Sequence, residues 1–170
     1  GSSITQDGGA SRPGNGSQAM IARRFDADFI NLGFSGSARG ETVMAEYLAQ
    51  IPCSVFVCDY DHNAPSAAHL RNTHEPLYRV FRAAQPTTPI VFVTKPDFHP
   101  GTEDEERRAI IRATYEKAVA EGDRAVYFID GETLFEGDWR DSCTVDGCHP
   151  NDLGFSRMAT VIGGVVGPLL

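Results

Sequence analysis

The chain has 170 residues, 41% of them hydrophobic and 22% charged, so it is long enough to bury a core and has the composition of a globular protein. Its net charge of −8 argues against a nucleic-acid partner, because a phosphate backbone attracts basic surfaces. No apolar run reaches the roughly 20 residues that a membrane-spanning helix needs. We therefore expect one soluble domain over residues 1–170, with no membrane partner, and the composition leaves open whether it is cytoplasmic or secreted.

Apolar periodicity and turn residues predict that helices and strands alternate along the chain. The predicted helices cover residues 17–24, 41–50, 66–85, 102 to the stop at Gly122, and a last segment that begins at an Asn151 or Asp152 cap. The predicted strands cover residues 27–32, 54–60, 89–94 and 124–129. Pro76 should break the third helix, with Thr73 capping its second half. This alternation predicts an α/β fold with a parallel sheet between two layers of helices.

The four cysteines do not form a recognisable metal motif. Cys53 and Cys58 flank a predicted strand, where extended chain separates them too far for a disulfide, so both should be free thiols. Cys143 and Cys148 lie in a loop and would be able to bridge in an oxidising compartment, which the sequence leaves open. Because no Cys-x-x-Cys pair exists, no metal site is predicted.

A serine between small residues stands in Gly-Ser-Ser-Ile-Thr at 1–5, which on its own could equally be the remnant of an expression tag. Two later residues supply hydrogen-bond donors that a serine esterase needs beside its nucleophile. Gly33 and Asn63 each follow a predicted strand, at the sheet edge where α/β proteins bind ligands. Gly33 would offer a backbone N–H, Asn63 a side-chain amide, and Ser3 its own N–H. Both Gly33 and Asn63 also suit ordinary turns.

Two Asp-x-x-His pairs are candidates for the general base and the carboxylate that orients it. Asp146 and His149 share one loop, and Asp59 and His62 have the same spacing, so spacing alone does not choose between them. A possible second nucleophile is Ser35, because residues 33–37 nearly spell the α/β-hydrolase elbow Gly-x-Ser-x-Gly. The fifth position is Ser instead of Gly, which argues against that fold.

The order of these blocks resembles the SGNH (GDSL-type) hydrolases over nearly the whole chain: Gly-Ser-Ser-Ile-Thr at 1–5, Gly33, Asn63, and Asp-Gly-Cys-His at 146–149. The residues within these blocks resemble those of the Gly-Ser-Ser-Ile-Thr-Gln branch of the family, which is related to carbohydrate acetyl esterases. The resemblance implies that Ser3 is the nucleophile, His149 the base and Asp146 its orienting carboxylate. It further implies that Ser3, Gly33 and Asn63 form the oxyanion hole. The chain departs from the family at Ser2, where the founding motif has Asp, and around Asn63, where the family usually has Gly-x-Asn-Asp.

What the resemblance implies for the whole protein is a flavodoxin-like three-layer α/β/α fold and esterase activity without a metal or organic cofactor. The expected substrate is a short acyl ester, most simply acetyl on a carbohydrate. Candidate substrate contacts, each of which would also suit a surface or structural role, are Arg39, Asp61, Lys95 and Trp139. His62 is expected near the pocket but outside the catalytic machinery.

Two alternative functions remain. A lysophospholipase or thioesterase of the same fold would need an apolar groove, lined for example by Phe34, Phe98 or Trp139. A non-catalytic polysaccharide-binding module would have kept the fold without the chemistry. The sequence does not indicate the oligomeric state.

The family's first strand leads directly into the nucleophile motif, and no such segment stands within residues 1–170. A sheet without this central member would leave buried backbone groups unpaired, at about 1–3 kcal/mol each. We therefore expect the native protein to continue N-terminally with this strand. A further N-terminal β-rich domain, as in many members of this branch, would fit that expectation.

Overall fold

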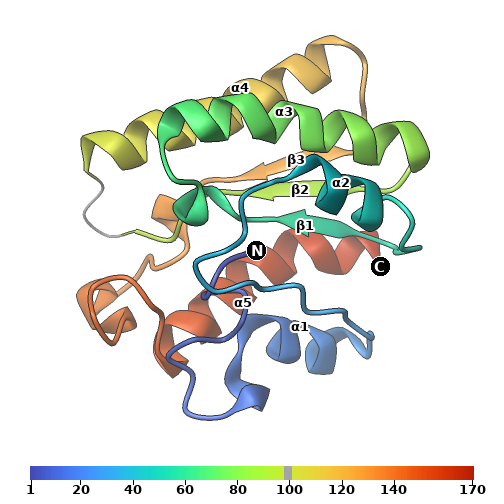
Figure 1. The fold of residues 1–170 in the computed structure, drawn as a ribbon. Coiled ribbons are helices and arrows are strands. Elements are labelled where there is room, and N and C mark those ends of the chain that lie inside the picture. The colour runs from blue at the N-terminus through green and yellow to red at the C-terminus, as the bar shows by residue number, and fades with distance from the viewer. Residues whose placement is uncertain (98–100) are drawn as a thin grey trace.

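The computed structural model describes residues 1–97 and 101–170. Within them, three parallel strands form one sheet in the order β1 (Phe56–Cys58), β2 (Ile90–Val93), β3 (Val126–Ile129). Every residue of the central strand β2 is buried, because its Ile-Val-Phe-Val run is covered on both faces. Helices lie above and below the sheet (Figure 1). The predicted three-layer α/β/α fold is confirmed.

The two helical layers bury opposite faces of the sheet. Helices α2 (Thr42–Leu48), α3 (Ala67–Ala84) and α4 (Thr102–Ala120) cover one face, and α1 (Ser17–Phe25) and α5 (Asp152–Val166) cover the other (Figure 1). Side chains alternate along β2, so Ile90 and Phe92 belong to the first core cluster and Val91 and Val93 to the second. Ile4, just after Ser3, is buried in the second cluster and anchors the start of the chain.

Helix α3 runs through Pro76 without a break, so the prediction of two helical pieces is wrong. Thr73 does not cap a second helix, because its hydroxyl donates to the His69 carbonyl inside the helix at 3.0 Å. Leu70 and Phe81, on either side of the proline, are both fully buried. Burial of this continuous apolar face offsets the hydrogen bond that the proline removes.

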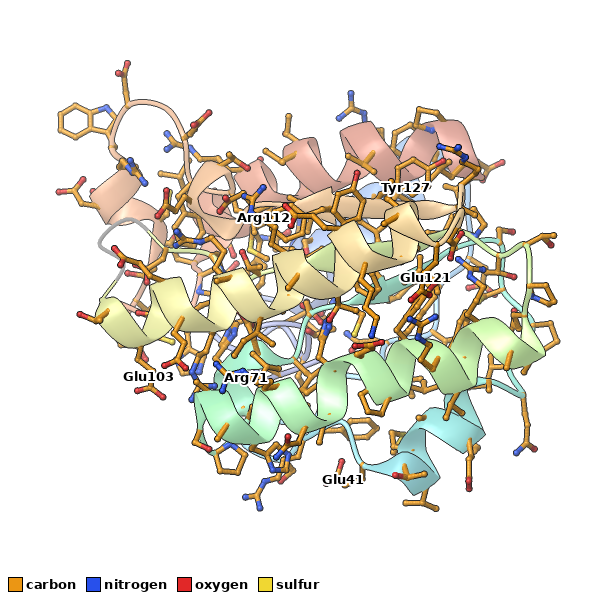
Figure 2. All side chains as sticks on the ribbon, turned by 90° about the horizontal axis from the view of Figure 1, so that it is seen from above. Glu41, Arg71, Glu103, Arg112, Glu121 and Tyr127 are labelled. Carbon is orange, nitrogen blue, oxygen red and sulfur yellow. The ribbon has the colours of Figure 1, made fainter. Side chains whose placement is uncertain are left out.

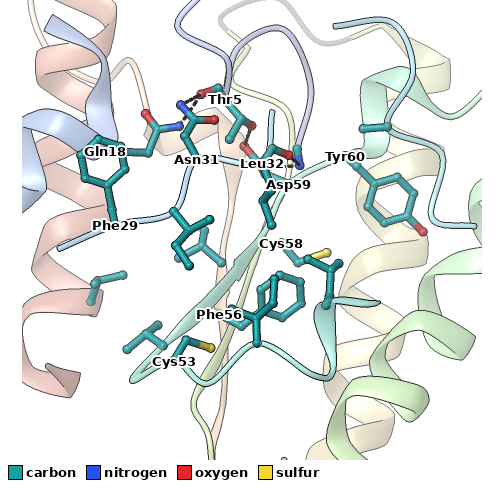
Figure 3. Close-up of a pocket in the computed structure, with 18 of the residues that line it drawn as sticks. Thr5, Gln18, Phe29, Asn31, Leu32, Cys53, Phe56, Cys58, Asp59 and Tyr60 are labelled. Atoms are coloured by element: carbon teal, nitrogen blue, oxygen red, sulfur yellow. Dashed lines mark hydrogen bonds and ion pairs between the residues drawn. The ribbon is translucent and has the colours of Figure 1, made fainter. Parts of the chain in front are cut away.

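Residues 27–32 form no strand, which also differs from the prediction. A cavity of about 980 Å³ is lined on one side by this segment and on the other by β1, with Phe29 and Phe56 among its apolar walls (Figure 3). Within the described residues β1 has β2 as its only strand partner, so its other edge faces this cavity. The additional strand expected there stays a prediction.

The other boundaries agree with the predicted ones to within a few residues. The predicted strand 54–60 is shortened to the three residues of β1. Helix α4 begins at residue 102 as predicted, after Gly101, whose N–H donates to the Asp104 carboxylate at 3.2 Å. All four cysteines are free thiols, so the disulfide left open between Cys143 and Cys148 is not formed here.

The outer surface of α3 and α4 carries ion pairs between the two helices (Figure 2). Arg71 lies 2.8 Å from Glu106, and Lys117 lies 2.6 Å from Glu75. Exposed pairs of this kind contribute at most about 1 kcal/mol each, so this face reads as solvated surface. In the part of the chain that the structure describes, no helix combines the length and apolar character needed to cross a membrane.

Candidate active site

The structure brings together three side chains from opposite ends of the sequence. The Ser3 Oγ lies 2.8 Å from the Nε2 of His149, and the His149 Nδ1 lies 2.7 Å from the Oδ2 of Asp146. A hydroxyl, an imidazole and a carboxylate in series at hydrogen-bond distance form the arrangement that activates a serine nucleophile. The three predicted catalytic residues are therefore in mutual contact.

Asp146 is held in its ionised form by its own loop. Its Oδ1 accepts the backbone N–H of His149 at 2.7 Å and that of Cys148 at 3.0 Å. Hydrogen bonds from the backbone and ring of His149, followed by that from Cys148, lower the pKa of Asp146 to about 2. An ionised Asp146 favours the tautomer with the proton on Nδ1 of His149, which leaves the Nε2 lone pair facing Ser3.

The loop that carries Asp146 and His149 is closed at its base by backbone pairing. The Val145 N–H donates to the His149 carbonyl at 2.9 Å, and Gly147 makes the turn with a φ of +85°. Asn151 then caps α5 directly after the loop, with its side chain accepting the Leu153 N–H at 3.0 Å. The sequence thus fixes the imidazole between a tight turn and a helix start.

The nucleophile loop, residues 1–8, turns so that the Ser3 carbonyl is used and its amide is not. The Gly8 N–H donates to the Ser3 carbonyl at 2.8 Å. Among the described residues, no acceptor lies within hydrogen-bond reach of the Ser3 N–H. An unengaged N–H on the nucleophile itself is one of the donors that an oxyanion requires.

Gly33 does not match its predicted role as an oxyanion donor. Its N–H donates to the side-chain Oδ1 of Asn31 at 2.9 Å and is therefore already engaged. Its α-carbon packs against the nucleophile loop so closely that a Cβ would overlap the backbone of Thr5 and Gln6. A glycine is needed at this position because two backbones meet there.

The structure offers Gly36, which the sequence reasoning missed, in place of Gly33. Gly36 has a φ of +67°, and within the described residues its N–H has no acceptor and nothing lies within 4 Å of its Cβ position. The neighbouring Ser35 N–H donates to the Gln6 Oε1 at 3.0 Å, and the Ala38 N–H reaches the Asn63 Oδ1 at 3.4 Å. In the sequence, Gly36 therefore lies between Ser35, which is hydrogen-bonded to the nucleophile loop, and Ala38, which is hydrogen-bonded to Asn63.

The same bond from Ala38 orients the amide of Asn63. Asn63 lies in a short 3₁₀ helix, Asp61–Asn63, just after β1, and its Oδ1 faces Ala38. Its Nδ2 has no acceptor among the described residues. The donor end of the side chain is thus available, as the prediction for Asn63 requires.

The second Asp-x-x-His pair is not assembled as a base and its partner. Asp59 accepts the Thr5 hydroxyl at 2.7 Å, and the His62 Nδ1 instead lies 2.9 Å from Asp61. Asp61 is 2% exposed and also accepts the Lys95 N–H at 2.9 Å, so it joins the ends of β1 and β2. Asp61 is therefore engaged within the protein, and its predicted contact with substrate stays a prediction.

Among the described residues, the remaining predicted substrate contacts have no hydrogen bond to Ser3, His149 or Asp146. Lys95 is engaged by the carboxylates of Asp97 and Asp104, at 3.3 and 3.2 Å. Arg39 is exposed beside the cavity, and Trp139 is 75% exposed. Phe98, one of the residues named for an apolar groove, lies outside the described residues. Within residues 1–97 and 101–170, no group of three or more His, Cys, Asp or Glu side chains is arranged to hold a metal.

The model of the GDSL-like lipase/acylhydrolase family matches residues 1–166 of the chain, and that match includes all three residues in contact. The chain belongs to this family. No curated protein sequence matches it. The family assignment agrees with the resemblance expected from the sequence.

Several solved structures share the GDSL-like fold. A GDSL-like protein from Bacteroides ovatus is 31% identical, with a TM-score of 0.88, and the match covers 99% of this chain and 51% of that one. A salicylyl-acyltransferase from a tetracycline biosynthetic pathway is 19% identical, with a TM-score of 0.80 over 95% of this chain and 51% of that one.

A family two carbohydrate esterase from Clostridium thermocellum, in complex with cellohexaose, is 18% identical, with a TM-score of 0.68 over 91% of this chain and 54% of that one. At identities under 25%, the last two structures support the fold alone. The chain spans about half the length of these solved relatives.

Proposed function

We propose that this GDSL-family chain is a serine esterase that works through an acyl-enzyme at Ser3. The observation that carries the proposal is the continuous hydrogen-bond path from the Ser3 hydroxyl through His149 to Asp146, at 2.8 and 2.7 Å. In this path His149 Nε2 takes the Ser3 proton as Oγ attacks the ester carbonyl. Asp146 stabilises the imidazolium that forms.

The tetrahedral intermediate needs donors for its oxyanion. Among the described residues, the Ser3 N–H, the Gly36 N–H and the Asn63 Nδ2 have no acceptor, and we assign them to this hole. The imidazolium of His149 then protonates the departing alcohol, leaving Ser3 acylated. A water molecule that His149 deprotonates hydrolyses the acyl-enzyme and restores the free serine.

We assign short acyl groups, with acetyl on a carbohydrate as the first candidate, to this esterase. The side chains of His149 and Asp146 are 34% and 50% exposed, so the alcohol side of the site is open enough for a bulky polymer. Among the described residues, neither Ser3 nor His149 lines the 980 Å³ cavity, which favours a short acyl group over a long chain held in that cavity. The fold shared with a carbohydrate esterase supports the same choice.

Two alternatives make different demands on the site. A lysophospholipase or thioesterase would place a long acyl chain in an apolar groove, and Phe34 does line the large cavity, although the triad does not. A non-catalytic polysaccharide-binding module would have no use for a connected Ser3–His149–Asp146 path.

Turnover of 4-nitrophenyl acetate by the wild-type protein and by Ser3→Ala tests the proposal. We expect kcat to fall at least about 1,000-fold, because the residual rate of a triad enzyme without its nucleophile comes from binding and oxyanion stabilisation alone. Ser35→Ala is the matched control and should retain wild-type turnover. Equal rates for wild type and Ser3→Ala would contradict the proposal. In the same assay, faster turnover of octanoyl than of acetyl esters would favour the long-chain alternative.

A further inference from the structure

Two amide side chains cross-link the nucleophile loop to the glycine loop, which we define as residues 31–38. Asn31 donates from Nδ2 to the Thr5 carbonyl at 2.8 Å (Figure 3). Its Oδ1 accepts the Gly33 N–H at 2.9 Å. In the opposite direction, Gln6 of the nucleophile loop accepts the Ser35 N–H on its Oε1 at 3.0 Å. The two bonds lie on either side of the point where Gly33 touches the nucleophile loop.

Thr5 is a fixed point in the molecule. Its hydroxyl donates to the largely buried Asp59 carboxylate at 2.7 Å, and its carbonyl also accepts the Gln18 side chain of α1 at 2.5 Å (Figure 3). Thr5 is thereby tied to both the sheet edge and the helical layer below it.

The glycine loop forms neither helix nor strand, and backbone bonds to Gly1 hold its first part. The Phe34 N–H donates to the Gly1 carbonyl and the Gly1 amino group donates to the Leu32 carbonyl, both at 2.8 Å. Through Asn31, the loop is attached to the fixed point at Thr5.

We propose that Asn31 and Gln6 are positioning residues that hold the Gly36 N–H against the nucleophile. This inference rests on the proposed function and deepens it. Gln6 binds the backbone N–H of Ser35, and Gly36 is the next residue. The Gln6 bond therefore fixes the position of the Gly36 N–H relative to the nucleophile loop. The Asn31 bonds fix the start of the same loop at Gly33. Among the described residues, neither side chain has a hydrogen bond to Ser3, His149 or Asp146.

This arrangement predicts that loss of the Asn31 or Gln6 bonds weakens stabilisation of the transition state and so lowers kcat. An oxyanion donor acts on the charge that develops during attack, so misplacing the donor lowers kcat and leaves ground-state binding unchanged. Removing one such donor lowers kcat by about 100- to 1,000-fold in other serine hydrolases. Loosening the loop that carries a donor should have a smaller effect, of about 10- to 100-fold.

The test compares Asn31→Leu and Gln6→Met, which keep side-chain size and remove the hydrogen bonds, in 4-nitrophenyl acetate hydrolysis. We expect each to lower kcat about 10- to 100-fold with KM changed less than about 3-fold. The shape of the pH–rate profile should stay that of the wild type, because the Ser3–His149–Asp146 bonds are untouched. Rates are normalised to active sites titrated by the acyl-enzyme burst, so that unfolded protein does not enter the comparison.

Gln18→Leu is the matched control, because Gln18 donates to the same Thr5 carbonyl from α1 and, among the described residues, has no hydrogen bond to the glycine loop. The bond from the Thr5 hydroxyl to Asp59 still holds Thr5 in this variant. It should keep kcat within about 3-fold of the wild type. Because Asn31 and Gln6 hold one loop, the double variant should lose less than the product of the single effects.

Wild-type kcat in Asn31→Leu and Gln6→Met, or an equal loss in Gln18→Leu and Asn31→Leu, would overturn the inference. An active Ser3→Ala would overturn the proposed function itself. An inactive Ser3→Ala beside an unaffected Asn31→Leu would overturn only the positioning role.

Discussion

Asp7 is an unusual residue in the nucleophile loop. It is not a glycine, yet its φ is +65°, and its carboxylate packs so tightly on Gly16 that a Cβ there would overlap it. Within the described residues its Oδ1 is buried without a hydrogen-bond partner. Burial raises the pKa of Asp7 from 3.8 to about 6.

This shift predicts that stability falls as pH rises past the acid range. The folded protein keeps the Asp7 proton up to about pH 6, whereas the unfolded chain releases it near pH 3.8. The folded state therefore binds more protons between these values, and the free energy of unfolding decreases with rising pH across this window. Asp7→Asn removes the titration. Its gain in Tm over the wild type should be larger at pH 8 than at pH 4, and a gain that does not change with pH would contradict this account.

Residue identity and order predict the contacts among Ser3, Asp146 and His149, but they do not identify the free oxyanion donors. Gly33 and Gly36 stand in one short stretch after the same predicted strand. Only the conformation shows that the Asn31 side chain engages the first N–H and leaves the second free. Side-chain hydrogen bonds to nearby backbone groups depend on local geometry that spacing does not reveal.

At the level of elements, α5 links the core to the catalytic loop. Asn151 caps the helix by accepting the N–H groups of Leu153 and Gly154 at 3.0 and 3.1 Å, and its Nδ2 donates to the Ser142 carbonyl at 2.8 Å. His149 lies two residues before this cap. The cap therefore stabilises the helix and fixes the loop that holds the imidazole.

Asn151→Ala should lower the free energy of unfolding by about 1–2 kcal/mol, the usual effect of losing a side-chain cap. We also expect lower kcat, because the His149 loop loses its attachment to Ser142. Urea unfolding and ester turnover measure the two effects. Asn72→Ala on the exposed side of α3 is the control and should change neither, since the Asn72 side chain has no hydrogen-bond partner among the described residues. Unchanged stability in Asn151→Ala would show that the cap does not support α5.

The predictions were correct for elements that local residue patterns determine. They were wrong for elements whose conformation depends on tertiary contacts. The buried run of β2 and the Asn151 cap of α5 were predictable from residue types. Residues 27–32 read as a strand, but a strand exists only where a neighbour pairs with it, and this segment faces a cavity. Pro76 reads as a helix break, but packing of α3 on the sheet overrides the local preference.

At the scale of the whole molecule, the large cavity runs along the open side of β1, and among the described residues its lining does not include Ser3 or His149. Within the described residues one edge of β1 has no strand partner, and such an edge suits a strand better than an acyl chain, because a strand would satisfy its N–H and C=O groups. This separation of cavity and nucleophile is why we assign the site to short acyl groups.

The nucleophile is the central claim, and covalent labelling tests it most directly. The full chain is incubated with an alkyl fluorophosphonate, which phosphonylates an activated serine, and the modified peptide is identified by mass spectrometry. We expect a single adduct on Ser3, with its formation abolished in His149→Ala because the imidazole takes the Ser3 proton. An adduct on Ser35, or no adduct on Ser3 in the folded protein, would contradict the account.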